Sequence, residues 1–377
     1  MDSLVYKLKL IKMKLLQVQN LNKEYYKGDK SVIGVLSDIN FFVKKGECFV
    51  IIGPNGSGKT TLLKIIGLLE LPTSGQIFYD KKDLIKITRK KKVEYRRKFS
   101  FVKQKPVVRD TTVFNNIVYG LKVRGIKFDD YQKSVDEIIE FIGLKGMEKQ
   151  NARSLSGGEM QRVAIAMNFI INPEIYLLDE VSANLDSMNL KLLDEFIMKI
   201  KQDKEKTIIM STHDPLEAIK YADRIAVLNN GQITQMGTPN EIFTAPKDEF
   251  TALFVGYENI LYGIAELDKS TGLSQIKVKD LIITASSQEE GDVKVCIRPE
   301  SIGIVKEPPK NTSYRNTFKG IVENIRELGN ICHLIVKCKS EKFLITITEL
   351  SRKNLGLEIG SQVFINFKAT DITILLS

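Results

Sequence analysis

The stretch ECFVIIGPNGSGKTTLLKIIGLL, residues 47–69, decides the fold of the first part of the chain. An apolar run at 47–52 leads into the glycine-rich loop at 53–60 and then into an amphipathic segment at 60–69. A strand, such a loop and a helix in this order suit a phosphate, because glycines let backbone N–H groups point at its oxygens. The start of the helix adds a favourable dipole. We therefore expect an α/β fold whose nucleotide-binding residues include Gly53, Pro54, Asn55, Gly56, Ser57, Gly58, Lys59, Thr60 and Thr61.

A second segment, IYLLDE at 175–180, is a short apolar run that ends in two acids. On its own it is equally a buried strand with a solvated carboxyl pair. Beside a phosphate-binding loop, Asp179 is predicted to hold Mg²⁺ through water and Glu180 to polarise the attacking water. Lys59 is then expected to reach the β- and γ-phosphates, and the Thr60 hydroxyl to ligate the same Mg²⁺.

The segment LSGGEMQRVAIAMNFI, residues 155–170, predicts a second helix start that attracts anions. Ser156 and the backbone of Gly157 and Gly158 precede a helix with an apolar face. A second phosphate-binding helix start in one domain makes sense if it serves the nucleotide of another copy.

The sequence has two histidines, and His213 follows the apolar run TIIMS at 207–211. A histidine at the end of a strand is commonly structural, but here it follows a phosphate-binding loop and an acid pair. His333 has no motif around it.

Together these segments resemble, in order and spacing, the ATP-binding subunit of an ABC transporter over residues 14–250. The resemblance implies a RecA-like core of the P-loop NTPase fold, with a helical subdomain at about 96–160. It implies that His213 contacts the γ-phosphate and acts with Glu180. Gln104 resembles the loop glutamine that senses Mg²⁺, and Tyr25 the aromatic residue that stacks on adenine, with Tyr26 as the competing choice. Two copies are expected to bind ATP between them as a homodimer.

After residue 250 the helical pattern gives way to short alternating strands, which predicts an all-β, OB-like barrel domain at 257–377. NILYGIAE at 259–266 and NTFKGIVE at 316–323 share Asn, Gly, Ile and Glu at the same places. This echo indicates internal duplication, although two strands can also be alike by chance.

Several short segments of this domain, RPES, TSYRN, TITELS, LGLEIG and FKAT, resemble the TOBE- or Mop-like barrels of molybdate and tungstate importers. The resemblance implies a cradle for a tetrahedral oxyanion, with cations to neutralise charge and hydroxyls to donate hydrogen bonds. The alternative is that these are ordinary surface residues. If the site exists, it would let accumulated oxyanion inhibit transport. The candidate residues are Ser313, Arg315, Thr348, Ser351 and Lys368.

The composition limits the partners. The net charge of +10 comes mostly from lysines spread along 377 residues, without the aromatic–basic interleaving that stacks bases, so we expect no nucleic acid. Mild attraction to anionic lipid fits better. No run of eighteen apolar residues occurs, and the first residues lack an apolar signal core; translation could start at Met1 or Met13. Four cysteines without metal-ligand spacing indicate ordinary thiols in a reducing compartment.

The sequence therefore predicts an ATP-hydrolysing subunit of an ABC importer for molybdate or tungstate, peripheral on the cytoplasmic face of the membrane. Its expected partners are two integral membrane permease subunits and, indirectly, an external substrate-binding protein. The alternatives are an importer of sulfate, polyamine, iron or sugar and, as a different class, an ABC ATPase of ribosomes or DNA. The latter usually carry two ATPase units or a long coiled coil, and this chain has one unit and no sustained heptads between residues 60 and 155.

Overall fold

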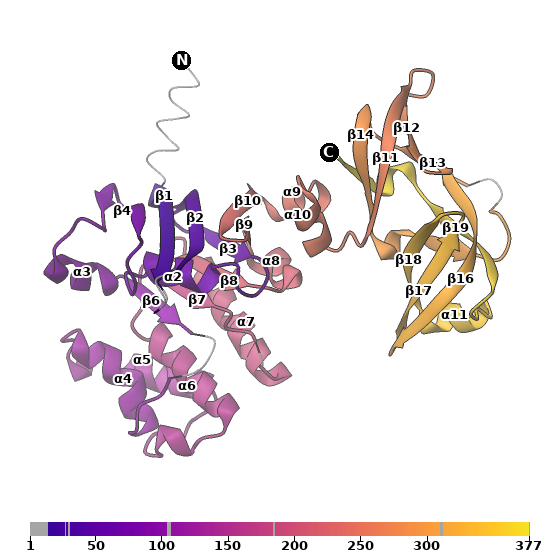
Figure 1. Cartoon of the computed structure of the whole chain (residues 1–377). Coiled ribbons are helices and arrows are strands. Elements are labelled where there is room, and N and C mark those ends of the chain that lie inside the picture. The colour runs from indigo at the N-terminus through magenta and orange to yellow at the C-terminus, as the bar shows by residue number, and fades with distance from the viewer. Residues whose placement is uncertain are drawn as a thin grey trace. The chain divides into compact units, whose positions relative to one another are not determined.

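The computed structural model describes residues 14–26, 28, 31–103, 107–183, 185–309 and 312–376 (Figure 1). The chain divides between Pro239 and Asn240 into two compact units, each with its own apolar core. Within the described residues, no helix is long and apolar enough to span a bilayer.

The first unit is built on a six-stranded sheet among the described residues. All its neighbouring strands pair in parallel except β10, which pairs antiparallel with β9. The central strands are buried along their whole length, as expected for a parallel sheet with both faces covered. In sheet order the strands are β10 (Gln232–Gly237), β9 (Arg224–Asn229), β3 (Cys48–Ile52), β8 (Thr207–Thr212), β7 (Ile175–Asp179) and β6 (Phe99–Val102).

A second, antiparallel sheet packs its apolar side chains into the same core. Its two longest strands, β1 and β2, have 13 residues each and pair with each other through several register shifts. In sheet order the strands of this sheet are β2 (Val32–Lys44), β1 (Lys14–Tyr26), β4 (Ser74–Tyr79) and β5 (Lys82–Asp83).

Helices complete the first unit. Figure 1 shows α4, α5 and α6 gathered beside one another, away from the antiparallel sheet. The residues of α4 and α5 fall within the segment of about 96–160 predicted as a helical subdomain, whereas most of α6 follows it. Several of these helices begin at a side-chain cap, such as Thr112, Ser156 and Asp186. The helices are α2 (Lys59–Ile66), α3 (Arg89–Arg96), α4 (Val113–Val123), α5 (Gln132–Phe141), α6 (Gly157–Phe169), α7 (Ser187–Gln202) and α8 (Pro215–Tyr221).

The second unit is a β-structure of two five-stranded sheets among its described residues, with one shared apolar core. The first sheet is β13 (Leu281–Ala285), β12 (Leu273–Val278), β11 (Asn259–Asp268), β14 (Gly291–Ile297) and β20 (Ile372–Leu376). The second is β18 (Glu341–Thr348), β17 (Ile331–Cys338), β16 (Asn316–Leu328), β19 (Gln362–Phe367) and β15 (Gly303–Val305).

The two sheets have the same strand order and exchange their last strands. In each half of the unit, the first three strands form a meander and the fourth pairs with the first. The final strand of each half then crosses over: β15 pairs with β19, and β20 pairs with β14. The sequence echo at 259–266 and 316–323 falls on β11 and β16, the corresponding first strands.

A pair of buried asparagines ties the halves together. Asn259 accepts from the backbone N–H of Leu344 at 2.7 Å and donates to its carbonyl at 2.9 Å. Asn316 makes the equivalent pair with Thr284, at 2.8 and 2.9 Å. Each first strand thus satisfies backbone groups on the third strand of the other half, which explains why both copies of the echo begin with asparagine.

Two short helices, α9 (Pro239–Thr244) and α10 (Glu249–Phe254), precede the first strand of the second unit. Glu249 on α10 accepts from the hydroxyl of Tyr262 on β11 and pairs with Lys294 on β14. Arg298 donates to the carbonyl of Phe243 at 2.8 Å. The segment 240–256 therefore packs on the β-structure, and the predicted boundaries of 14–250 and 257–377 remain a prediction about the family domains.

Candidate nucleotide site

The loop between β3 and α2 has a backbone that tolerates no side chain at two of its glycines. A Cβ on Gly53 would lie 2.1 Å from the carbonyl oxygen of Leu228. Gly58 caps α2 with φ +106°, and a Cβ there would lie 2.7 Å from the Leu36 side chain. Only glycine adopts this conformation at little cost, so the loop curls tightly against β9 and β2. Pro54 is half-buried, while Asn55 and Gly56 form the exposed tip.

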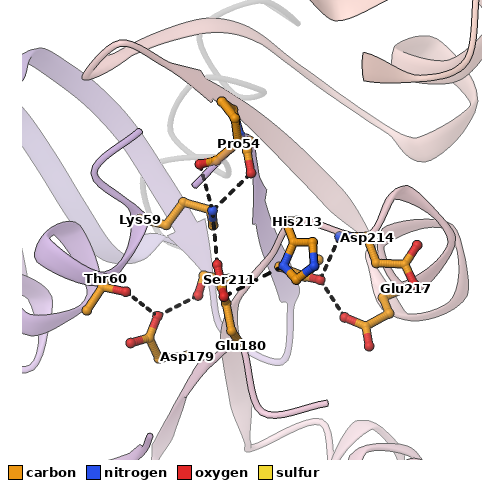
Figure 2. A network of polar contacts seen from close by, with 11 residues as sticks. Pro54, Lys59, Thr60, Asp179, Glu180, Ser211, His213, Asp214 and Glu217 are labelled. Carbon is orange, nitrogen blue, oxygen red and sulfur yellow. Dashed lines mark hydrogen bonds and ion pairs between the residues drawn. The ribbon is translucent and has the colours of Figure 1, made fainter. Parts of the chain in front are cut away.

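Lys59, the first residue of α2, is folded back over this loop (Figure 2). Its ammonium donates to the carbonyls of Gly53 at 2.9 Å and Pro54 at 3.0 Å, and it pairs with Glu180 Oε1 at 3.0 Å. The residue is 4% exposed. An ammonium has three donors, and these contacts use them all, so a bound phosphate would take the place of at least one.

Asp179 ends β7 and is held by two hydroxyls from neighbouring elements (Figure 2). Its Oδ1 accepts from Thr60 on α2 at 3.0 Å and from Ser211 on β8 at 2.8 Å. Asp179 and Ser211 are buried. The parallel register that sets Asp179 opposite Ser211 brings the carboxylate to the phosphate-binding loop.

Glu180 follows Asp179 directly in the chain. Its side chain lies between Lys59 and His213 (Figure 2). Its φ of +47° is uncommon for a residue with a side chain. The two carboxylate oxygens face different partners: Oε1 pairs with Lys59, and Oε2 lies 3.6 Å from Nδ1 of His213. The predicted pair of Glu180 and His213 is therefore brought together with Lys59.

The turn that carries His213 is fixed by its neighbours. The buried hydroxyl of Thr212 donates to Glu217 at 2.5 Å and accepts from the backbone N–H of Asp214 at 3.0 Å. Asp214 in turn caps α8 by accepting from Leu216 at 2.8 Å. The side chain of His213 is half exposed, so it lies at the open side of the site.

A buried hydroxyl in the loop, that of Ser57, is placed where it could hydrogen-bond to a phosphate. The hydroxyl oxygen of Ser57 is buried and has no hydrogen-bond partner in the described structure. A buried unpaired hydroxyl is costly, and a bound ligand is one way in which it is satisfied. The residues around Lys59 therefore fit a nucleotide.

Thr60 and Asp179 also fit Mg²⁺, because oxygen ligands suit this ion. The described residues contain no cluster of three or more His, Cys, Asp or Glu side chains that could hold a metal. Mg²⁺ is commonly held by one or two protein groups together with water and substrate phosphates, so a pair of oxygens is the expected protein contribution.

Tyr25 and Tyr26 differ in their surroundings. The hydroxyl of Tyr25 hydrogen-bonds to Glu70, and Thr61 on α2 is also within hydrogen-bonding reach. Burial, followed by the hydrogen bond to Glu70, raises the pKa of Tyr25. Tyr26 is 73% exposed. Tyr25 is thus the tyrosine adjacent to the helix of the phosphate-binding loop.

The predicted second helix start lies at the beginning of α6. Ser156 caps the helix reciprocally with Glu159, whose carboxylate accepts from the Ser156 N–H at 2.9 Å. A Cβ on Gly158 would lie 2.6 Å from the amide nitrogen of Asn189 on α7, whereas Gly157 faces open space. These contacts preorganise the helix start. Gln104, the predicted loop glutamine, lies outside the described residues.

The five oxyanion candidates fall into two groups in the second unit. Arg315 and Lys368 flank the paired residues Asn316 and Phe367, at one end of the second sheet. Ser313 precedes them on the exposed approach to β16.

The other two candidates are at the far end of the same sheet. Thr348 is paired with Ile331, which is paired with Leu328 at the end of β16. Thr348 caps α11 (Glu349–Asn354) by accepting from the Ser351 N–H, and the two hydroxyls lie 2.8 Å apart. β16 has 13 residues at about 3.3 Å each, so one chain does not bring the five side chains around one ion.

Three residues that support the site were not predicted. Ser211 holds Asp179, and Thr212 with Glu217 fixes the turn of His213. The signal for Ser211 was available, because a serine follows three apolar residues in a fully buried strand. The signal for Glu217 was weaker, since an acid in the first turn of a helix is common.

The fold and the site define an ATPase of the ABC transporter family, and comparisons with known proteins agree. The family model described as ABC transporter matches residues 36–183, and that of the TOBE domain matches residues 312–374. The chain belongs to the ATP-binding subunits of ABC importers. The predicted fold class and the predicted transport ATPase are thereby confirmed.

Two groups of curated relatives are similar along nearly the whole chain. The molybdate/tungstate import ATP-binding protein WtpC of Pyrococcus horikoshii is 36% identical, covering 95% of this chain and 99% of the relative. The spermidine/putrescine import ATP-binding protein PotA of Spiroplasma citri is 35% identical, covering 96% and 97%.

Solved structures match a part of the chain. The dimeric post-hydrolysis structure of the ATP-binding cassette MJ0796, bound to ADP and Pi, is 29% identical with a TM-score of 0.55. It covers 59% of this chain and 98% of its own. CbiO1 of Clostridium perfringens, part of the ABC transporter complex CbiONQ, is 29% identical with a TM-score of 0.54 and covers 62% and 92%.

Proposed function

We propose that this chain hydrolyses ATP to power the import of molybdate or tungstate. The observation that carries the substrate is the pair of exposed cations, Arg315 and Lys368, at one end of the second sheet of the second unit, together with the similarity to WtpC over 95% of the chain. The chain would work as a homodimer on the cytoplasmic face of the membrane, beneath two permease subunits that an external binding protein supplies.

In the nucleotide site, Lys59 would exchange its loop carbonyls and Glu180 for substrate phosphates. Glu180, released at one oxygen and near His213 at the other, would accept a proton from the attacking water while His213 orients it. Thr60 and Asp179 would hold Mg²⁺, which supplies charge neutralisation for phosphoryl transfer. Gln104 would sense Mg²⁺, and Tyr25 would stack on the base.

The start of α6 supports the dimer. Within the described chain, Ser156 and Gly158 contact α6 and α7 themselves, and the face at Gly157 is open. Backbone N–H groups at a helix start bind anions. They would therefore complete the nucleotide site of a second copy, as the dimeric state of the MJ0796 structure also suggests by similarity.

The separation of the oxyanion candidates favours a site shared between copies. Arg315 and Lys368 supply charge at one end of β16, and the hydroxyls of Thr348 and Ser351 lie at the other end. One ion would meet both groups only if the second group came from another chain. Such a shared site would couple oxyanion binding to the arrangement of the dimer, and through it to ATPase rate.

A polyamine importer is the second candidate, because two PotA proteins are 35% and 38% identical to this chain and WtpC is 36% identical. A polyamine would need carboxylates at the regulatory site, whereas the exposed candidates at the start of β16 are the cations Arg315 and Lys368. The charge of this end therefore favours an anion.

The test is calorimetric titration of the full chain with tungstate, molybdate, sulfate and spermidine. We expect the first two to bind, with affinity reduced roughly 10-fold or more in Arg315→Ala and in Lys368→Ala, because a charged hydrogen-bond partner is lost. Lys269→Ala, an exposed cation in the turn after β11, is the control and should bind normally. Binding of spermidine alone would replace the proposal with the polyamine alternative.

A further inference from the structure

A cavity in the second unit is lined by none of the five oxyanion candidates. It has a volume of about 870 Å³ and opens where β16 and β17 separate. β16 pairs with β19 from Asn316, but with β17 only from Ile321 onward. The first residues of β16 therefore have a partner strand on one side, and the cavity occupies the other side.

The rim of this cavity is cationic. Lys319, Lys337 and Lys339 line it together with one acid, Glu323. That acid is already paired, with Lys342 at 2.7 Å and Lys337 at 3.8 Å, and the Lys342 ammonium holds its pKa below the ordinary value. No carboxylate in the described part of the chain pairs with Lys319. The rim thus carries unneutralised positive charge.

The floor of the cavity is apolar. Phe318 stacks on Phe343 at a ring distance of 6.4 Å, and both pack in the core of the unit. Leu281 and the 48% exposed Ile321 complete the apolar lining. Ligand sites combine an apolar surface with a few polar groups that fix orientation, and this cavity has both, within the usual range of volumes.

The first half of this unit offers a comparison, because its own chain supplies a carboxylate at the corresponding place. Tyr262 on β11 corresponds to Lys319 on β16, and in that half α10 brings Glu249 to Tyr262 and to Lys294. A carboxylate therefore meets the outer face of the first sheet from within the chain. On the second sheet, no carboxylate from another described element reaches Lys319.

We propose that this cavity binds an amphiphilic anion, a molecule with an apolar or aromatic body and one carboxylate, phosphate or sulfonate group. The apolar body would lie on Phe318 and Ile321, and the charged group would meet Lys319 and Lys337. One water molecule takes up about 30 Å³ in the liquid, and a tetrahedral oxyanion has the volume of only a few waters. Such an ion would therefore fill only a small part of a cavity of about 870 Å³. The site is thus distinct from the oxyanion candidates and does not rest on the proposed transport substrate.

The duplication supplies matched controls. Ile321 is paired with Lys337 on the second sheet, and Ile264 is paired with Lys277 at the same positions of the first sheet. Both isoleucines are about half exposed, at 48% and 54%, so a charged substitution at either should leave the fold intact.

The probe is 8-anilinonaphthalene-1-sulfonate, titrated by fluorescence into the folded full chain with Mg²⁺ and saturating ADP to fill the nucleotide site. We expect affinity to fall at least 5-fold in Ile321→Glu and in Lys337→Ala, and to stay unchanged in Ile264→Glu and Lys277→Ala. Decanoate should displace the probe, and sulfate at equal concentration should not. Circular dichroism verifies the fold of each variant.

Equal affinity in Ile321→Glu and Ile264→Glu would overturn the proposal, because the probe would then lie elsewhere. Failure of the folded protein to bind the probe would also overturn it. Displacement by sulfate as effective as by decanoate would show a plain anion site and reject the amphiphilic ligand.

Discussion

Glu180 is the residue on which the nucleotide site depends. It lies between Lys59 and His213 in a backbone conformation that costs energy, and such strain persists only where the surroundings enforce it. The carboxylate is positioned before any substrate arrives. Its release from Lys59 is then a step that substrate phosphates themselves would drive.

We predict that Glu180→Gln lowers the ATPase turnover number roughly 100-fold or more, because an amide does not accept the proton. ATP binding should persist, since the phosphate contacts of the loop remain. Steady-state hydrolysis and binding of a fluorescent ATP analogue measure the two properties. The control is Glu174→Gln, the same substitution just before β7, where the acid pairs with Lys98. Normal turnover in Glu180→Gln would remove the proposed role.

Ser211 offers a subtler test, because it acts through Asp179 and not on the substrate. Ser211→Ala removes one of the two hydroxyls that donate to Oδ1. We predict that the Mg²⁺ concentration for half-maximal ATPase rises roughly 10-fold, as is typical when a partner of a metal-binding group is lost. Ser211→Thr should restore the normal Mg²⁺ requirement. A change in turnover without a change in Mg²⁺ requirement would contradict this role.

Among the elements, the first strands of the two halves in the second unit connect one half to the other. Asn259 and Asn316 each bridge to the third strand of the opposite half with two hydrogen bonds. Both are buried, so no water replaces a lost partner.

We predict that Asn259→Ala or Asn316→Ala lowers the free energy of unfolding of this unit by about 2–4 kcal/mol, because two buried backbone groups are left unpaired. Scanning calorimetry of the full chain should show one transition at lower temperature. Asn324→Ala, an exposed asparagine on β16, is the control. Equal shifts in the buried and the exposed variants would show that the bridges contribute nothing.

Glu349, at the start of α11, should make the stability of the protein depend on pH. The Arg352 guanidinium, and next the Cys332 thiol that donates at 2.6 Å, hold the pKa of Glu349 well below its usual range. A carboxylate whose pKa is lower in the folded state stabilises fully above its unfolded pKa, about 4.3. This stabilisation is lost as the pH falls through the folded value.

The melting temperatures of the parent protein and Glu349→Gln should therefore differ most at neutral pH and converge in acid. Melting curves between pH 7 and about pH 3 test this, with the exposed Glu358→Gln as control. A difference that grows on acidification would have the wrong sign and would refute the assignment.

At the scale of the whole chain, each unit contains its own core, so the second unit should fold alone. We predict that a fragment of residues 240–377 unfolds cooperatively by circular dichroism. A fragment of residues 240–315 should not, because the first sheet then lacks β20 and the core loses the second half. Cooperative folding of the shorter fragment would contradict the interdependence of the halves.

The sequence allowed the fold class to be predicted because its decisive segments are local. The loop at 53–60, the acid pair after β7 and the helix start at 156 each combine a spacing with a chemistry that few structures use. The sequence did not allow us to predict which strands pair over long distances in the chain, or in which register. That Asp179 faces Ser211, and that Arg315 and Thr348 are at opposite ends of a sheet, follows from strand register, which no short motif encodes.

The substrate remained open for a different reason. WtpC and PotA relatives share the same nucleotide chemistry, so most of the identity reflects ATP hydrolysis and not the cargo. The residues proposed to favour an anion, Arg315 and Lys368, lie on the surface of the second unit, where sequence pattern alone does not separate a ligand contact from a solvated lysine.

The exchange of final strands has a consequence for ancestry. A chain that contained only one half would have four strands of its own sheet and a last strand with no place in it. Such a chain would complete the fold only by trading that strand with a twin, which makes a pair of identical polypeptides the natural precursor of this unit. Duplication and fusion of the gene for such a chain would turn contacts between two molecules into contacts within one, as the bridges made by Asn259 and Asn316 are in this chain.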